Sequence, residues 1–244
     1  MKSIPLKAAA VNNDKITAVI NVEPALAMME CKIPINMVNS LNDYIDSTRS
    51  SAESHAPGLV GQINRNKESS QLYMNKEDKF VKEFVKTLEK LSSCYIATMG
   101  YEKFHVECDD IWTVHSYAGD YNPLHNHYVK TKIGLSSILY LKLSDEMLDN
   151  KKSTVNFNNA SGDGDGHTFF TWGTTGTQDI NMMRYNTERY VKPEVGKLLI
   201  FPHWLKHSVN PFFGEGERRT LAANFNVATN DKLLQHVYQL PLKQ

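Results

Sequence analysis

Two histidines, His125 and His127, are separated by a single residue and directly follow a turn that contains Asn122 and Pro123. In an extended chain, side chains two residues apart point to the same side, so the two imidazoles would face the same way. Such a pair can supply two nitrogen ligands to one metal ion. Asn122 is a candidate to orient one of these ligands through a hydrogen bond; the alternative is an ordinary turn residue before a proline.

A second block, G-K-L-L-I-F-P-H-W-L-K-H-S-V, spans residues 196–209. Gly196 precedes a continuous apolar run, which is typical of a strand buried on both faces, and His203 and His207 follow it. The next predicted strand begins with the paired arginines Arg218 and Arg219. A guanidinium group is a planar, two-pronged donor that matches the geometry of a carboxylate.

In this order, the His-x-His pair, the segment G-K-L-L-I-F-P-x-W-L-x-H and the Arg-x-Thr strand resemble a family of iron(II)- and 2-oxoglutarate-dependent oxygenases. The likeness covers about residues 112–227 and extends more faintly into the amino-terminal part. It implies a double-stranded β-helix, or jelly roll, with Fe(II) as the cofactor and 2-oxoglutarate as the co-substrate.

The resemblance implies His125 and the distal His207 as two of the metal ligands. The family usually has a carboxylate two residues after the first histidine, and this position is His127 here. Three neutral histidines still form a competent set on one face of a metal, and the same set also binds catalytic zinc. We therefore expect His125, His127 and His207 to be the ligands. The alternative keeps one of the first pair and recruits a carboxylate such as Asp120, while His203 is interpreted as structural.

The resemblance also implies residues that bind the co-substrate. In the family, an arginine lies about ten residues past the distal histidine and is followed at plus two by a hydroxyl residue, a pattern that Arg218 and Thr220 fit. Both would share one face of their strand, and Arg219 would point out. Tyr140 corresponds to an aromatic position of a family motif, where its hydroxyl would reach a carboxylate of the oxo acid; a buried core tyrosine is the alternative.

Helical patterns occur only in the first part of the chain. Residues 36–45 space their apolar side chains at helical intervals, with Asn36 as a candidate cap, and residues 76–91 form an amphipathic stripe. Elsewhere the sequence favours strands, at 15–22, 59–63, 102–108, 110–117, 134–143, 154–157, 167–171, 189–191, 197–201 and 218–227. Short strands with turns between them favour an antiparallel sandwich or barrel. The predicted class is α+β, mainly β: a jelly roll with amino-terminal supporting helices.

The length of 244 residues suits one domain, 1–244, in which an extension of residues 1–95 packs on a jelly-roll core of residues 96–230. An apolar content of 41% and a charged content of 22% are ordinary for a soluble protein. The 27 basic and 27 acidic residues balance, so there is no electrostatic reason to expect a nucleic acid or a membrane as partner. A homodimer is left open.

The cysteines Cys31, Cys94 and Cys108 are odd in number and widely spaced. This spacing argues against a disulfide framework and for a reducing compartment. The first residues lack the long apolar run of a signal peptide. We expect a cytoplasmic protein.

These features predict an Fe(II)- and 2-oxoglutarate-dependent dioxygenase that hydroxylates a C–H bond of an unknown prime substrate, with release of succinate and CO2. Two alternative functions stay open. One is a three-histidine, cupin-like metalloenzyme that uses no 2-oxoglutarate, such as a thiol dioxygenase. The other is a non-catalytic jelly-roll binding module.

Overall fold

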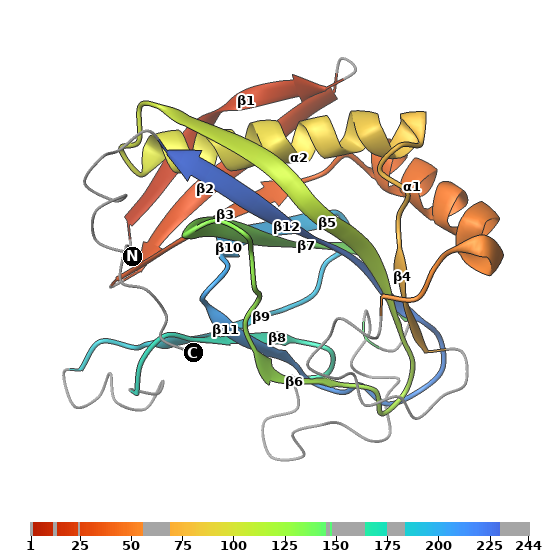
Figure 1. Cartoon of the computed structure of the whole chain (residues 1–244). Helices are drawn as coiled ribbons and strands as arrows, with labels where there is room; N and C mark the ends of the chain where they lie inside the picture. Colours follow the sequence, from red (N-terminus) through yellow and green to blue (C-terminus); the bar gives the residue numbers. More distant parts are fainter. Residues whose placement is uncertain are drawn as a thin grey trace, which may run out of the picture.

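Two antiparallel β-sheets are stacked face to face, and two helices cover the outer face of the larger one (Figure 1). The computed structural model describes residues 2–11, 14–23, 25–55, 69–144, 147, 164–174 and 184–229. The strands predicted at 59–63 and 154–157 lie outside these ranges. The architecture is mainly β with supporting helices, as predicted.

The larger sheet has eight strands in the order β1-β2-β3-β10-β7-β12-β5-β4. Their bounds are β1 Lys2–Val11, β2 Asp14–Glu23, β3 Leu26–Lys32, β4 Ser70–Tyr73, β5 Phe104–Ser116, β7 Ile133–Lys142, β10 Lys197–Pro202 and β12 Arg218–Thr229. Four of them come from the first 95 residues of the chain, so this part does more than pack against the jelly roll. Through the pairing of β3 with β10 and of β4 with β5, it extends the sheet.

The smaller sheet has four strands in the order β6-β11-β8-β9. Their bounds are β6 Asn122–His125, β8 Thr168–Thr171, β9 Glu188–Val191 and β11 Lys206–Val209. The two histidine-bearing strands, β6 and β11, are hydrogen-bonded neighbours in this sheet. Their side chains therefore reach one place although they are far apart in sequence.

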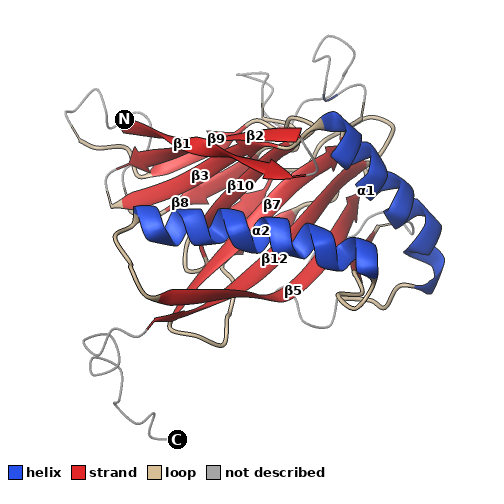
Figure 2. Cartoon of the chain, turned by 90° about the horizontal axis from the view of Figure 1, so that it is seen from above, coloured by secondary structure: helices blue, strands red, loops and turns tan. Residues whose placement is uncertain are grey.

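Helices α1, Ile35–Thr48, and α2, Lys79–Thr98, lie across the outer face of the larger sheet, as Figure 2 shows from above. A short 3-10 helix, Arg49–Ser51, follows α1. The Asp78 side chain caps α2 by accepting a hydrogen bond from the Phe80 N–H. The prediction that Asn36 caps α1 is wrong, because the cap position is Pro34 and no side chain caps this helix.

Strand alternation separates two layers of the core. In β10, Leu198 and Ile200 pack in the layer between the sheet and the helices, whereas Leu199 and Phe201 pack between the two sheets. The apolar run after Gly196 is thus buried on both faces, as predicted. Among the described residues, no helix combines the length and apolar character that crossing a bilayer requires.

Most predicted strands are present, with ends shifted by one or two residues. The two strands predicted at 102–108 and 110–117 form the single strand β5, which continues through a bulge at Asp109. On β12, Asn224 pairs with Asp110 and Phe225 pairs with Cys108, so Asp109 has no partner in the register. An extra residue of this kind turns the following side chains to the other face.

Candidate metal centre and co-substrate pocket

Three imidazoles meet between the two sheets. His125 is the last residue of β6 and pairs with His207 of β11. His127 follows β6, and its backbone N–H donates to the His203 carbonyl. One ring nitrogen from each of His125, His127 and His207 lies within 4.8 Å of the others. The prediction of two histidines on one strand is therefore only half right, since the second lies just beyond the end of β6.

Backbone carbonyls fix the orientation of two of these rings. Nδ1 of His125 lies 2.6 Å from the Pro123 carbonyl oxygen, and Nδ1 of His207 lies 3.0 Å from that of Leu205. A carbonyl can only accept, so each Nδ1 carries the proton and each Nε2 keeps its lone pair for a metal. Nε2 of His127 is 3.1 Å from Nε2 of His207. Two nitrogens bound at a right angle, each about 2.1 Å from one metal ion, would be about 3 Å apart.

The environment keeps all three rings neutral at pH 7. Burial lowers the pKa of His207 to about 3. Burial, followed by the neighbouring His207 and His125, lowers the pKa of His127 well below its ordinary value. Burial also lowers the pKa of His125, although its bond to Pro123 opposes the shift. Neutral imidazoles are the form that binds a metal, and they suit iron as well as zinc.

Arg218 lies in the same pocket as the histidines. This arginine pocket is lined by Gln71, Trp112, Val114, Asn122, His125, His127, Ile138, His207, Val209, Arg218, Thr220 and Ala222. The Arg218 side chain is only 2% exposed, and its Nη2 has no hydrogen-bond partner in the described part of the chain. Its Nε donates to the Gly166 carbonyl at 3.2 Å. A buried guanidinium nitrogen without a partner is costly, so the site is suited to an incoming anion.

The other predicted co-substrate residues have different positions. Thr220 and Asn122 line the arginine pocket. Tyr140 is fully buried below Arg218, whose guanidinium carbon lies 5.3 Å from the centre of the tyrosine ring. The Tyr140 hydroxyl lies 2.6 Å from the hydroxyl of Thr168. Tyr140 thus supports the arginine from beneath and is not among the residues that line the pocket.

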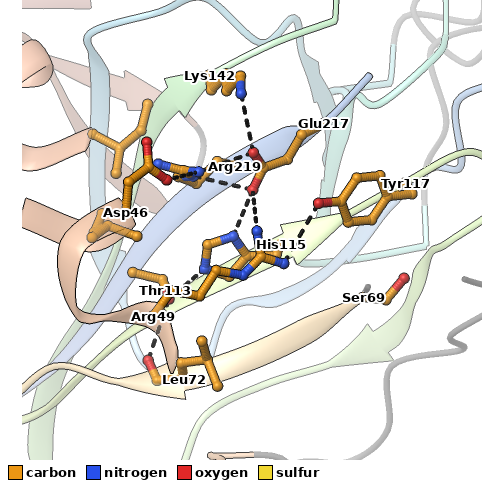
Figure 3. A network of polar contacts seen from close by, with 12 residues as sticks. Asp46, Arg49, Ser69, Leu72, Thr113, His115, Tyr117, Lys142, Glu217 and Arg219 are labelled. Atoms are coloured by element: carbon orange, nitrogen blue, oxygen red, sulfur yellow. Dashed lines mark hydrogen bonds and ion pairs between the residues drawn. The ribbon is translucent and has the colours of Figure 1, made fainter. Parts of the chain in front are cut away.

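Arg219 faces away from the pocket, but it does not point into solvent. It is 2% exposed and lies on the helix side of the larger sheet, where it pairs with Glu217 at 3.0 Å and with Asp46 of α1 at 2.6 Å (Figure 3). Glu217 also contacts Nδ1 of His115 at 2.5 Å. Burial raises the pKa of Glu217, but hydrogen bonds from His115 and Arg219 outweigh it and hold that pKa well below its usual range.

The alternative ligand Asp120 is engaged elsewhere. Its carboxylate accepts hydrogen bonds from the Tyr117 N–H, at 2.9 Å, and from the Ser69 hydroxyl. It is not part of the histidine cluster found among the described residues. Nδ1 of His203 lies 3.1 Å from the Gly134 carbonyl oxygen, outside the same cluster.

Several residues of the site were not singled out from the sequence. Trp112 and Val114 of β5 and Gln71 of β4 line the arginine pocket, and Thr168 holds Tyr140. Trp112 and Val114 could have been predicted from the alternation of side chains along β5, because the two residues share one face of the strand. Gln71 and Thr168 reach the site only through the pairing of the sheets.

Residues 110–224 match the model of a protein family described as "Putative 2OG-Fe(II) oxygenase". This segment is thus similar in sequence to 2OG-Fe(II) oxygenases. The resemblance predicted from the sequence, over about residues 112–227, is thereby confirmed. Among curated proteins, none matches the chain in sequence.

Solved structures of low sequence identity share the fold of this chain. A prolyl-4-hydroxylase from Pseudomonas putida is 13% identical, with a TM-score of 0.53, over 82% of this chain and 91% of that chain. HygX from Streptomyces hygroscopicus, with nickel and 2-oxoglutarate bound, is 9% identical, with a TM-score of 0.52, over 82% of each chain. SnoN, an α-ketoglutarate-dependent epimerase from nogalamycin biosynthesis, is 9% identical, with a TM-score of 0.53, over 88% of this chain and 86% of that chain.

Family and fold together favour a 2OG-Fe(II) oxygenase over the two alternative functions, the cupin-like enzyme and the non-catalytic module. The jelly-roll fold predicted from the sequence is confirmed by the same structures.

Proposed function

We propose that this protein is an Fe(II)- and 2-oxoglutarate-dependent dioxygenase that hydroxylates a C–H bond. In this proposal His125, His127 and His207 hold the iron, and Arg218 with Thr220 binds the distal carboxylate of 2-oxoglutarate. When bound, iron and 2-oxoglutarate supply the oxidising power: one O2 converts 2-oxoglutarate and a C–H bond into succinate, CO2 and an alcohol.

One observation carries the proposal. A cluster of three neutral imidazoles and a buried guanidinium with an unpartnered Nη2 line one pocket. Neither feature is specific by itself, since three histidines also suit zinc and buried arginines also stabilise folds. Together they match a metal and a bound dicarboxylate, because the Arg218 Nη2 could donate to a carboxylate while the three imidazoles would hold the metal.

The protein's own residues would bind, orient and shield the co-substrate. The carbonyl bonds of His125 and His207 preserve the ring orientation, and Tyr140 with Gly166 holds Arg218 in place. The apolar walls formed by Val114, Ile138, Val209 and Ala222 exclude water from the pocket. Exclusion of water strengthens the attraction between the guanidinium and a carboxylate.

The test is a titration of 2-oxoglutarate into the protein loaded anaerobically with Fe(II). We expect a weak visible charge-transfer band to grow with 2-oxoglutarate and slow release of succinate after exposure to air. His207→Ala should lose tight iron binding and both signals, whereas His105→Ala, a change at an exposed position of β5, should keep them. Folded, iron-loaded wild-type protein that gives neither band nor succinate would contradict the proposal and favour the cupin-like enzyme.

A further inference from the structure

A second, larger cavity lies beside the histidines. It has a volume of about 820 Å3 and shares Trp112, His125 and His127 with the arginine pocket. We call it the Asp110 cavity. Its other lining residues are His55, Tyr73, Asp109, Asp110, Asn126, Tyr128, Val129, Lys130, Thr131, Lys132, His203 and Asn224. The histidine cluster is therefore accessible from two sides.

The two pockets lie at different positions along the same strands. On β12, Arg218 pairs with Ser116 at one end of β5, and Asn224 pairs with Asp110 in the middle of β5. Arg218 and Asn224 are six positions apart on the strand, which corresponds to about 20 Å. If Arg218 binds 2-oxoglutarate, as proposed above, the co-substrate occupies one end of this face. The middle of the face, with the Asp110 cavity, is left for the prime substrate.

The bulge in β5 is what places Asp110 in this cavity. Cys108 packs in the layer beneath the helices, and without the bulge Asp110, two residues later, would face the same way. Lys76 holds the bulge by donating from its Nζ to the carbonyls of Cys108 and Asp109. The extra residue instead gives Asp110 the same facing as Trp112. Bulges of this type commonly re-aim a side chain next to an active site.

The two neighbouring carboxylates differ in their partners. Asp109 pairs with Lys130 at 2.6 Å. The Asp110 carboxylate has neither a hydrogen bond nor an ion pair with the residues that the structure describes, although its side chain is partly buried. Burial lowers the pKa of His55 and raises that of Tyr73, and the charge of Asp110 raises both. The charge of Asp110 thus acts on both rings, and it also contributes to the raised pKa of Lys130.

Aromatic side chains line the same cavity as Asp110, among them His55, Tyr73 and Trp112. The His55 ring stacks on Trp112, with centroids 4.3 Å apart and planes at 11°, and lies 4.4 Å from the Tyr73 ring. His55 is 6% exposed, and its Nδ1 has no hydrogen-bond partner among the described residues. On its other contact, the Trp112 ring lies near the His127 ring, with centroids 5.7 Å apart. A carboxylate without an ion pair, beside aromatic rings, is an arrangement that attracts an organic cation.

We propose that the Asp110 cavity binds the prime substrate and that Asp110 pairs with a positively charged nitrogen of it, an ammonium or guanidinium group. The inference rests on the proposed function for the placement of 2-oxoglutarate at Arg218. It adds the chemical class of the substrate: a compound or peptide side chain that carries a basic amine or guanidine near the C–H bond to be oxidised. His55 and Tyr73 form the aromatic wall around the cation.

Two matched pairs of probes test the charge preference. One pair is Nα-acetyl-arginine methylamide and its neutral citrulline counterpart, and the other is Nα-acetyl-lysine methylamide and its norleucine counterpart. Each is titrated by calorimetry into the full chain loaded anaerobically with Fe(II) and 2-oxoglutarate. We expect the cationic member of at least one pair to bind about tenfold or more tightly than its neutral counterpart.

Variants then assign the preference to one carboxylate. Asp110→Asn should abolish it and Asp110→Glu should keep it, while Glu107→Gln, at an exposed position of β5 that does not line the cavity, should also keep it. Equal binding within both pairs in the wild-type protein, or a preference that persists in folded Asp110→Asn, would overturn the proposal. The wild-type comparison is valid even if Asp110→Asn does not fold. Failure of the proposed function is seen separately, as the absence of the charge-transfer band and succinate in wild-type protein.

Discussion

Arg218 and Arg219 are neighbours on β12, yet their guanidinium groups lie on opposite faces of the larger sheet. Arg218 faces the histidines, whereas Arg219 bonds to Glu217 and to Asn42 and Asp46 of α1. One strand thus connects the pocket to the helix layer. Substitutions at the two positions should therefore impair different properties: co-substrate binding at Arg218 and stability at Arg219.

Arg218→Ala should weaken 2-oxoglutarate binding with little loss of fold. Removing the partner of a buried carboxylate costs about 2–5 kcal/mol, which corresponds to about 30-fold or more in the dissociation constant. Arg218→Lys should recover only part of the affinity, because an ammonium lacks the two-pronged geometry. Calorimetry on the iron-loaded protein measures both. An unchanged affinity in Arg218→Ala would remove this residue from the co-substrate site.

Arg219→Ala should instead destabilise the fold. The change removes one of the partners of the buried Glu217 carboxylate and the contact between β12 and Asp46 of α1, at a cost of about 3–5 kcal/mol. Denaturant unfolding measures this loss. Asp46→Ala is the matched control, since it removes only the exposed end of the same contact and should cost about 1 kcal/mol or less. Equal, small losses in both variants would contradict a structural role for Arg219.

His127→Asp tests the position where the family usually has a carboxylate. A charged oxygen ligand would replace a neutral nitrogen, so we expect the variant to retain Fe(II) binding, while His127→Ala should bind it more weakly. Equilibrium dialysis with anaerobic Fe(II) compares the two. If folded His127→Asp lost the metal while His127→Ala kept it, the three-histidine set would be wrong.

Tyr140→Phe separates support of Arg218 from direct contact with the co-substrate. The ring beneath the guanidinium remains, and only the hydroxyl that meets Thr168 is lost. The expected effect is about 1 kcal/mol of stability and less than about a threefold change in 2-oxoglutarate affinity. A loss of affinity as large as that of Arg218→Ala would show instead that the hydroxyl contacts the co-substrate.

The lowered pKa of Glu217 predicts how the stability of the protein depends on pH. Its pKa in the folded protein lies well below its ordinary value of 4.5, so the unfolded chain binds a proton first as the pH falls. The stabilisation is therefore fully present above about pH 4.5 and is lost progressively below it. Glu217→Gln should be less stable at pH 7 and should show a shallower loss of unfolding free energy below pH 4.5. Parallel pH profiles for the two proteins would contradict this assignment.

The sequence predicted the part of the site that depends on local patterns. Alternation along β12 correctly put Arg218 and Thr220 on one face, and a buried β10 followed from its apolar run. The position of Asp110 could not be predicted in this way, because a bulge reverses the alternation after Cys108 and has no clear local signal. The burial of Arg219 depends on α1, whose contact with β12 is a property of the folded chain.

The order of strands in the larger sheet has a consequence for synthesis. β3 ends at residue 32, but its inner neighbour β10 begins only at residue 197, and β7 lies between β10 and β12. At about 5–20 residues per second, a ribosome needs on the order of ten seconds or more to make the intervening chain. During this time β3 can pair on one edge only, with β2, and β7 lacks both of its neighbours. Bare strand edges pair readily with other chains. Nascent chains halted before β10 should therefore aggregate, while chains extended through β12 can close the sheet.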